Sequence, residues 1–492
     1  MNSIRITESD NVAVALHPIA AGEAVDAVGG ALKASEDIPQ GHKVALTPIE
    51  EGEAVIKYGF PIGHATESIT AGRWVHTHNV KTNLSGEVEY SYHPCITWPE
   101  KAEPENFMGF RRDDGRAAIR NEIWIIPTVG CVNDIAKKMV ADNQDLVKGS
   151  VEGLYTFTHP FGCSQTGADH AQTRKLLAAL VRHPNAGAVL VLSLGCENLT
   201  HEQFLKELGP YDEQRVKFLT CQEVEDEFSA GRKLLEELAA YAGKFSREPV
   251  PVSELVVGMK CGGSDGLSGI TANPTVGRFS DMLTARGGST VLTEVPEMFG
   301  AEGFLMDRCV NEEVFHKAEK MLNGFKDYFI RHGEVVYDNP SPGNKQGGIT
   351  TLEDKSCGCV QKGGTAPIAD VIGYGDPVVT KGLNMLYGPG NDLVSATAMT
   401  ASGAHLILFT TGRGTPFGAP APTLKIATNS QLAQKKSGWI DFNAGSIVDG
   451  ETIQEAAQRL LELVIETAGG KKTKAEERGF REISIFKDGV VL

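Results

Sequence analysis

From Met108 onward, short apolar runs rich in β-branched residues alternate with segments of helical period, and five of the runs lead to a cysteine. The runs are NEIWIIPTVGC, GLYTFTHPFGC, AGAVLVLSLGCEN, VKFLTC and SELVVGMKCGGSDG. Such alternation is typical of parallel βαβ units. Ligands of these sheets bind outside the carboxyl ends of the strands. We therefore expect the thiols of Cys131, Cys163, Cys196 and Cys261 to lie in one cleft.

The composition limits the class of protein. The chain of 492 residues is too long for a single hydrophobic core, so two or three domains are expected. The net charge of -16 argues against a nucleic acid or an anionic membrane as a partner. No apolar run is long enough for a bilayer, and the N-terminus lacks the features of a signal peptide. The odd count of 9 cysteines favours free thiols in a reducing compartment, which predicts a cytoplasmic protein.

A short motif occurs four times near the N-terminus, as IAAGEAV, IPQGHKV, IEEGEAV and ITAGRWV. A glycine turn followed by a strand ending in valine predicts a small β domain over residues 1–80. Residues 81–107 are rich in proline and lack a helical period, which predicts an extended linker. Two α/β domains, at 108–248 and 249–492, are expected to follow.

Two histidines and an asparagine, His76, His78 and Asn79, follow the fourth copy of the motif. A strand places residues i and i+2 on the same face, so both imidazoles could face one ligand. The alternative is a half-buried pair hydrogen-bonded to the backbone, and the residues themselves leave both possibilities open.

Other expected strand-end loops carry polar groups that suit an oxygen-rich ligand. Glycines and hydroxyls in such loops offer backbone N–H groups, and Lys or Arg can supply the local cation that an acidic chain otherwise lacks. The residues concerned are His159, Ser264, Asp265, Glu294, Lys355, Lys362 and Arg413.

Common cofactor motifs are absent from the sequence. There is no G-x-G-x-x-G, Walker A, H-E-x-x-H or G-x-S-x-G motif. The C-x-C pair at 357–359 is too short for a structural zinc knuckle, and the C-x2-C-x2-C run of iron–sulfur proteins is missing. A single Fe²⁺-like ion fits His, Cys and carboxylate ligands better.

Several long motifs together resemble the altronate/galactarate dehydratase family. They are HTHN, GFRRDDGRAAIRNEIWIIPTVGCVN, HPFGCSQ, LGCEN, CGGSDGLSGITANPTVGRFSD, TEVPEMFGAE, SCGCVQKGG and TTGRGTPFG, which together span essentially the whole chain. The resemblance implies an N-terminal β-clip, SAF-like domain followed by Rossmann-like α/β domains with parallel strands. It also implies dependence on Fe²⁺ or Mn²⁺.

The reaction that the resemblance implies is loss of water from D-altronate to give 2-dehydro-3-deoxy-D-gluconate, a step of hexuronate catabolism. Galactarate, another aldarate or aldonate, or a sulfolactate-type substrate is the alternative within the family. A metal on the substrate carboxylate and hydroxyl would stabilise the enediolate formed when a base removes the C2 proton. An acid would then protonate the departing C3 hydroxyl.

From the resemblance and the loops we predict a role for each candidate residue. The catalytic residues are predicted to be His76, His78, His159 and Glu294. The substrate-binding residues are predicted to be Asn79, Ser264, Asp265, Lys355, Lys362 and Arg413. The metal ligands are predicted to be His76, His78, Cys163 and Cys261.

Two hypotheses of other kinds stand beside this one. The first is a non-catalytic sugar-acid binding protein, which would not need the histidines and Glu294. The second is an oxygen-sensitive iron–sulfur hydro-lyase. The expected partners are the small sugar acid and further copies of the chain, in a homo-oligomer such as a dimer.

Overall fold

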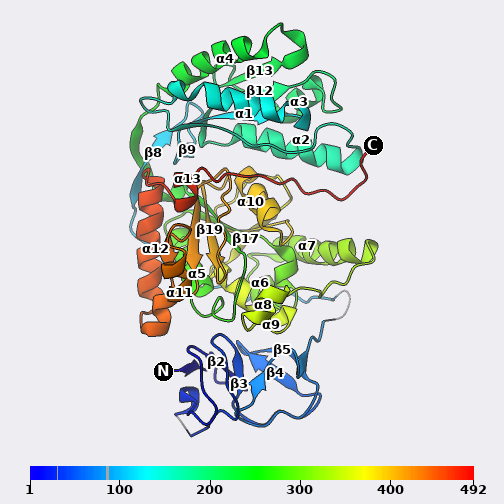
Figure 1. The fold of residues 1–492 in the computed structure, drawn as a ribbon, viewed down its shortest axis with the longest axis vertical. Helices are drawn as coiled ribbons and strands as arrows, with labels where there is room; N and C mark the ends of the chain where they lie inside the picture. Colours follow the sequence, from blue (N-terminus) through cyan, green and yellow to red (C-terminus); the bar gives the residue numbers. More distant parts are fainter. Residues whose placement is uncertain (30, 85–87) are drawn as a thin grey trace.

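The computed structural model describes residues 1–29, 31–84 and 88–492, and it has three domains in a row (Figure 1). The N-terminal domain lies at one end, the second domain lies at the other end, and the C-terminal domain lies between them. The small antiparallel sheets followed by parallel α/β sheets confirm the expected fold class. Within the described ranges, no helix combines the length and apolar character that a bilayer crossing requires.

The N-terminal domain contains two small antiparallel sheets. The first has the order β1-β2-β3-β6 and the second β4-β5-β7. Their strands are β1 Ser3–Ile4, β2 Val12–Ala15, β3 Lys43–Ala45, β4 Ala54–Lys57, β5 Phe60–Ala65, β6 Trp74–Val75 and β7 Val80–Lys81.

The fourfold motif has a direct structural meaning in this domain. Its isoleucines form two antiparallel bridges, Ile19 with Ile38 and Ile49 with Ile69, and all four are 1% exposed. The motif glycines all have φ between +80° and +86°, a left-handed conformation that favours glycine. The valines that end each copy are fully buried. The repeat therefore specifies four tight turns that are closed in pairs by buried isoleucines.

The second domain consists of parallel βαβ units, as expected. Its sheet has the order β11-β10-β12-β13, and every pairing within it is parallel. The strands are β10 Glu122–Pro127, β11 Gly153–Thr156, β12 Ala186–Ser193 and β13 Val216–Thr220. The helices are α1 Asn133–Asp142, α2 Gly167–Arg182, α3 His201–Leu208 and α4 Glu227–Ala242.

The C-terminal domain is built on a parallel sheet with the order β17-β18-β16-β15-β19-β20-β21. The strands are β15 Val256–Cys261, β16 Ser289–Leu292, β17 Ile368–Ile372, β18 Gly382–Leu386, β19 Leu406–Thr411, β20 Thr423–Ala427 and β21 Phe442–Asn443. The helices are α5 Ala272–Ala285, α6 Gly303–Met306, α7 Glu312–Arg331, α8 Pro342–Gln346, α9 Leu352–Cys359, α10 Asp392–Ala401, α11 Ser430–Lys435, α12 Ile453–Ala468 and α13 Lys474–Glu477.

Another small antiparallel sheet joins the second and C-terminal domains. It consists of β8 Asn106–Arg111, β9 Ala117–Ala118 and β14 Arg247–Pro251 in the order β14-β8-β9. The boundaries expected from the sequence, at 107/108 and 248/249, fall inside β8 and β14. These two strands pair with each other, because the chain leaving the second domain returns beside the chain that enters it.

Between β7 and β8, residues 82–84 and 88–105 contain no helix or strand, and residues 85–87 of the expected linker lie outside the described residues. The segment lies against the C-terminal domain. The Tyr90 hydroxyl donates to the Glu302 carboxylate at 2.9 Å, and the Tyr92 hydroxyl donates to the carbonyl of Cys309 at 2.8 Å. These contacts fix the path of the segment on that domain.

A buried group of charges joins the N-terminal domain to α9. The ammonium groups of Lys43 and Lys57 lie 2.8 Å and 2.9 Å from the two oxygens of Asp354, and all three side chains are at most 2% exposed. Burial by itself disfavours the charged carboxylate, but the two ammonium groups hold the pKa of Asp354 well below its usual range. Asp354 therefore stays ionised and couples the two domains electrostatically.

We predict that Asp354→Asn destabilises the protein by about 3–5 kcal/mol, because it leaves two buried ammonium groups without a counter-charge. The measurement is the free energy of unfolding from denaturant titration. The Asp354 contribution is present above the pKa of an unfolded aspartate, about 4, and is lost as the pH falls toward the lower folded value.

The matched control is Glu67→Gln, which removes an exposed ion pair with Arg73. This change should cost less than about 1 kcal/mol. Equal stability of the two variants at neutral pH would show that the buried group does not hold the domains together.

Candidate functional site

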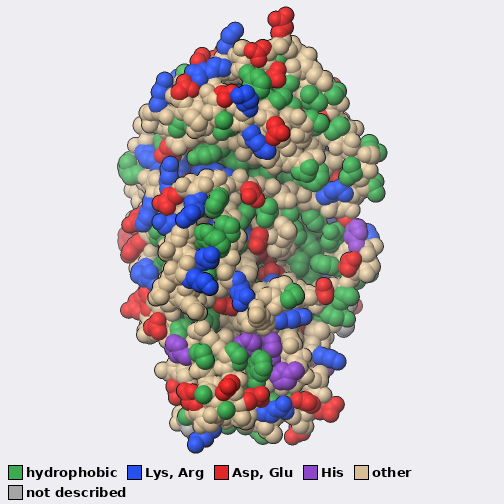
Figure 2. Space-filling view, in the orientation of Figure 1, with side chains coloured by type: hydrophobic (Ala, Val, Ile, Leu, Met, Phe, Trp, Pro, Cys, Tyr) green, Lys and Arg blue, Asp and Glu red, His purple; other side chains and the backbone are tan. Residues whose placement is uncertain are grey.

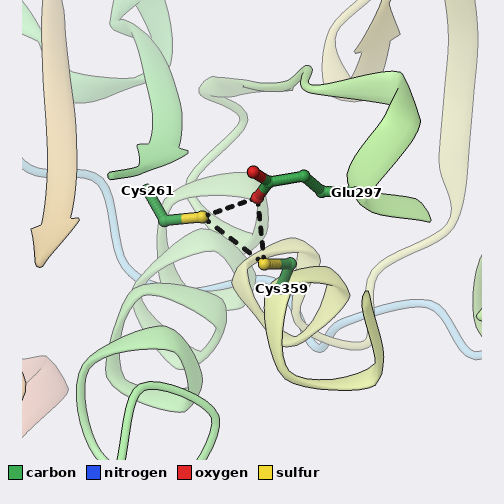
Figure 3. A group of neighbouring side chains, drawn as sticks. All are labelled: Cys261, Glu297 and Cys359. Carbon is green, nitrogen blue, oxygen red and sulfur yellow. Dashed lines mark hydrogen bonds between the residues drawn. The ribbon is translucent and has the colours of Figure 1, made fainter. Parts of the chain in front are cut away.

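Three side chains from distant parts of the C-terminal domain meet in the buried interior (Figure 3). One oxygen of Glu297 lies 3.0 Å from the sulphur of Cys261 and 3.1 Å from that of Cys359. The two sulphurs are 3.4 Å apart. We call Cys261, Glu297 and Cys359 the thiol–carboxylate group.

The parallel sheet explains how these residues come together. Cys261 ends β15, and Glu297 lies in the short helix Val295–Met298 that follows the neighbouring strand β16. Cys359 is the last residue of α9. The chain turns sharply after β16 at Glu294, which has a left-handed backbone with φ of 71°. The C-terminal ends of two adjacent strands thus deliver two of the three side chains, as parallel sheets usually do for ligand sites.

Three buried lysines lie around this group, and they form ion pairs with Glu297 and with the neighbouring Glu294. Lys355 contacts Glu297 at 2.8 Å, and Lys362 and Lys260 contact Glu294 at 3.3 Å and 2.9 Å. They supply the local positive charge that the acidic chain was expected to need at an anion site. The structure thus places two of the predicted substrate-binding residues, Lys355 and Lys362, beside the predicted ligand Cys261.

The charge states of these groups depend on one another. Burial opposes the charged form of Lys362, but the neighbouring thiols and carboxylates hold its pKa well above the usual value. Burial would also raise the pKa of Glu297, yet the ammonium groups of Lys355 and Lys362 lower it to about 2. The hydrogen bond with Cys261 and burial together raise the pKa of Cys359. The pKa values of Lys260 and Lys355 are raised in the same way, so all three lysines are charged at neutral pH.

The thiol–carboxylate group fits a divalent metal ion. Within the part of the chain that the structure describes, it is the only group of three or more potential ligands whose ligand atoms all lie within 4.8 Å of one another. Two sulphurs and a carboxylate oxygen are donors that suit iron, whereas Mn²⁺ prefers oxygen donors. A bound cation would replace the S–H···O hydrogen bonds and favour the thiolate forms.

A narrow crevice beside the group is lined by both the N-terminal and C-terminal domains, with Lys57, Ser264, Asp265 and Lys355 among its residues. Ser264 is 2% exposed, and its hydroxyl has no hydrogen-bond partner among the residues described. A buried polar atom without a partner is costly, so this hydroxyl is suited to receive a ligand.

A wider cavity of about 420 Å³ lies on the outer side of the crevice, and Asp265 lines both. The cavity contains Arg413, whose guanidinium donates to the Gln346 side chain at 3.0 Å. Gln40 of the N-terminal domain also lines it. Asp265 and Arg413 thus line the wider cavity, and Ser264 and Asp265 line the crevice, whose volume of about 10 Å³ holds little more than one water molecule.

The histidine pair does not lie on one face of a strand. β6 ends at Val75, and the chain then turns, so His76 is buried while His78 is exposed. The side chain of Asn79 closes this turn, because its oxygen accepts the amide of His76 and its nitrogen donates to the carbonyl of Trp74. The structure thus gives both polar groups of Asn79 a partner within the turn.

His76 nevertheless faces the C-terminal domain. Its ring stacks on Trp74 and lies 3.3 Å from the hydroxyl of Thr350, which precedes α9. Burial and the nearby Lys43 lower the pKa of His76 to about 3, so its ring is neutral at physiological pH. Figure 2 shows histidine side chains gathered on the N-terminal domain near its border with the C-terminal domain.

His159 and Cys163 lie in the second domain. Both ring nitrogens of His159 have backbone partners, the carbonyl of Pro127 at 2.8 Å and the amide of Phe161 at 3.2 Å. The sulphur of Cys163 lies 3.5 Å from the side-chain oxygen of Asn198. In this arrangement neither side chain contacts the thiol–carboxylate group.

The expectation of one cleft for four thiols is wrong. Cys131, Cys163 and Cys196 follow strands of the second domain, whereas Cys261 ends a strand of the separate seven-stranded sheet. The sequence shows strand–cysteine units but not which strands share a sheet. The chain builds two parallel sheets and therefore two carboxyl edges.

Glu297, Cys359 and Lys260 were not among the predicted site residues, although weak signals were present. Glu297 is one of three glutamates after one strand, and Cys359 belongs to the C-x-C pair flanked by lysines. The spacing of the C-x-C pair is too short for a structural zinc knuckle. In the structure Cys359 pairs with the distant Cys261 instead, which local spacing does not reveal.

Comparison with known proteins gives consistent matches along the chain. Residues 1–83 match the altronate/galactarate dehydratase SAF domain. Residues 109–243 match the second domain of D-galactarate dehydratase/altronate hydrolase, and residues 252–491 match the C-terminal domain of D-galactarate/altronate dehydratase.

Full-length relatives agree with these matches. The chain is 52% identical to an altronate dehydratase of Bacillus subtilis (strain 168), over 99% of both chains. It is 50% identical to an altronate dehydratase of Escherichia coli (strain K12), over 100% of both. It is 33% identical to a galactarate dehydratase (L-threo-forming) of Escherichia coli (strain K12), over 99% of this chain and 97% of the relative.

We predict that Cys261→Ser, Cys359→Ser and Glu297→Gln each weaken the binding of Fe²⁺ at this site, because each change removes one of three ligands. The measurement is anaerobic titration of the metal-free protein with Fe²⁺. Cys357→Ala is the control, since Cys357 is buried on the same helix but lies outside the group. An affinity that all four variants share with the parent would exclude the group as a metal site.

Proposed function

This chain belongs to the D-galactarate/altronate dehydratase family, and we propose that it removes water from D-altronate to give 2-dehydro-3-deoxy-D-gluconate. The observation that carries the proposal is the identity of about half of all residues with altronate dehydratases over the full length. Galactarate is the second candidate substrate, and the lower identity to a galactarate dehydratase makes it less favoured.

The site has the chemistry that such a reaction requires. A divalent metal held by Cys261, Glu297 and Cys359 would act as a Lewis acid toward the substrate carboxylate and hydroxyl. We propose Fe²⁺, because two thiolates favour it over Mn²⁺. Beyond this ion, the residues of the chain must bind the acid, take up a proton from C2 and return one to the C3 hydroxyl.

The buried lysines suit the first of these tasks, the binding of the acid. The raised pKa values of Lys355 and Lys362 keep both groups charged, so they can pair with the substrate carboxylate. Glu294 holds two of the lysines with its two oxygens, and we assign it a positioning role.

We propose that the N-terminal domain supplies the proton acceptor. The neutral ring of His76 can take a proton, and its neighbour Thr350 adjoins Ile349, which lines the crevice. His78 lies at the same turn but is exposed, so it would act only on a substrate that enters from the surface. The ion group of Lys43, Lys57 and Asp354 would hold this domain over the crevice.

We also propose a cytoplasmic location and a homo-oligomeric state. All nine cysteines are free thiols, which suits a reducing compartment. The homo-oligomeric state is proposed from the long segment before β8, which has no helix or strand over residues 88–105, and from the acidic surface of the chain.

We predict that the protein dehydrates D-altronate, that a chelator abolishes this activity, and that Fe²⁺ restores it. The product is measured as a 2-keto acid under anaerobic conditions. Galactarate in the same assay should give a lower kcat/KM. Full turnover by protein shown to be metal-free would disprove the metal requirement, and turnover of galactarate alone would reassign the substrate.

We predict that His76→Ala lowers kcat by at least ~10²-fold, the usual scale for a positioned proton-transfer group, with little change in thermal stability. His78→Ala should do the same if this second histidine is also a ligand or proton carrier. His64→Ala is the control, because this half-buried ring on β5 has Asn83 as its hydrogen-bond partner and does not contact His76 or Thr350 in the structure. Near-normal kcat with reduced stability would instead assign His76 a packing role.

A further inference from the structure

Three cysteines of the second domain occupy equivalent positions that the proposed reaction does not use. Cys131, Cys163 and Cys196 follow β10, β11 and β12, and each is directly preceded by a glycine. These three strands are neighbours in the parallel sheet. The three Gly-Cys loops therefore open on the same edge of that sheet.

The glycines let the loops pack backbone against backbone. A Cβ atom on Gly162 would lie 1.9 Å from the carbonyl oxygen of Thr128, and one on Gly130 would lie 2.9 Å from that of His159. The amide of Gly130 also donates to the carbonyl of Phe161 at 2.8 Å. The close approach brings the residue before Cys131 against the loop that carries Cys163.

Polar side chains orient the sulphurs of the other two loops. Asn198, two residues after Cys196, has its side-chain oxygen 3.5 Å from the sulphur of Cys163. The side-chain nitrogen of Gln222 donates to the sulphur of Cys196 at 3.4 Å. Cys131 and Cys196 are exposed and Cys163 is partly exposed, so a ligand from solution can reach them.

A second observation at the same loops points to a bound ligand, because two polar side-chain atoms there have no hydrogen-bond partner. Gln165, two residues after Cys163, is 2% exposed, yet its side-chain nitrogen has no hydrogen-bond partner among the residues described. Asn133, two residues after Cys131, is half-buried, and its side-chain oxygen also has no hydrogen-bond partner among the residues described. A buried N–H group beside thiolates can donate to the sulphur atoms of a bound cluster.

The available ligands at this edge are sulphur atoms. Both nitrogens of His159 are occupied by backbone groups, and the carboxylate of Glu197 accepts hydrogen bonds from Thr128 and from the amides of Leu194 and Gly195. Thiolates without oxygen or nitrogen ligands are typical of iron–sulfur clusters and of zinc.

The distances between the sulphur atoms distinguish a single zinc ion from an iron–sulfur cluster. Tetrahedral coordination with metal–sulphur bonds of about 2.3 Å requires sulphurs about 3.8 Å apart. The three thiols are spread more widely, since the only described group of potential ligands within 4.8 Å of one another is the thiol–carboxylate group. A cluster has bridging sulfide and several iron atoms, so its protein ligands need not lie so close together.

We propose that Cys131, Cys163 and Cys196 bind an iron–sulfur cluster, with one iron atom that no protein thiolate ligates. This site is distinct from the thiol–carboxylate group and does not depend on the proposed dehydration. The Gly-Cys loops hold the three thiolates, and the nitrogen of Gln165 donates to a cluster sulphur.

The test is anaerobic reconstitution of the full chain with Fe²⁺ and sulfide. The expected result is acid-labile sulfide bound together with iron, and a broad visible absorption band that dithionite bleaches. Iodoacetamide followed by mass spectrometry should then show the three thiols protected relative to the apo protein, which needs no variant. Iron or zinc bound without sulfide, or three thiols equally alkylated before and after reconstitution, would overturn the proposal.

Variants give a second, independent comparison. Cys131→Ser, Cys163→Ser and Cys196→Ser should each cause loss of labile sulfide, with circular dichroism confirming the fold. Cys95→Ser, at an exposed thiol outside this domain, should keep the full sulfide content. Cys359→Ser should lower only the iron of the thiol–carboxylate group. Labile sulfide retained in the triple serine variant would contradict the assignment.

Discussion

The buried charges around α9 are the constraint on which the arrangement of the N-terminal and C-terminal domains depends. Asp354 near the start of this helix holds two lysines of the N-terminal domain, and Lys355 next to it holds Glu297. Burying any one of these charges alone would cost several kcal/mol, so each needs its partner in place. The domain interface and the candidate metal site thus both depend on a buried charge carried by α9.

The buried lysines at the site explain why an acidic chain can hold an anionic substrate. The overall charge of -16 would repel a sugar acid, but the lysines at the site are held in their charged form by the glutamates and thiols around them. Local charge, not net charge, decides binding at a buried site, because the interior screens poorly. The N-terminal domain adds Lys57 to the crevice and covers it from the other side.

The two parallel sheets give the protein two separate carboxyl edges. One edge carries the thiol–carboxylate group and the lysines, and the other carries the three Gly-Cys loops. At both edges a sulphur atom lies at or after the C-terminal end of a parallel strand, and it is buried at Cys261 but exposed or partly exposed in the Gly-Cys loops. The second domain and the N-terminal domain lie on opposite sides of the C-terminal domain (Figure 1). This arrangement separates the thiols of the second domain from the histidines of the N-terminal domain.

The sequence alone determined the alternation of strands and helices, the turns of the fourfold motif, the family and the family's chemistry. These features depend on local periodicity, on glycines at left-handed positions and on long motifs, all of which are present along the chain. The tertiary structure decided which side chains meet. Cys261, Glu297 and Cys359 come from separate segments, and His76 and His78 diverge because Asn79 closes a turn directly after β6. Pairings of this kind depend on which strands share a sheet and where each strand ends, and local sequence spacing does not encode either.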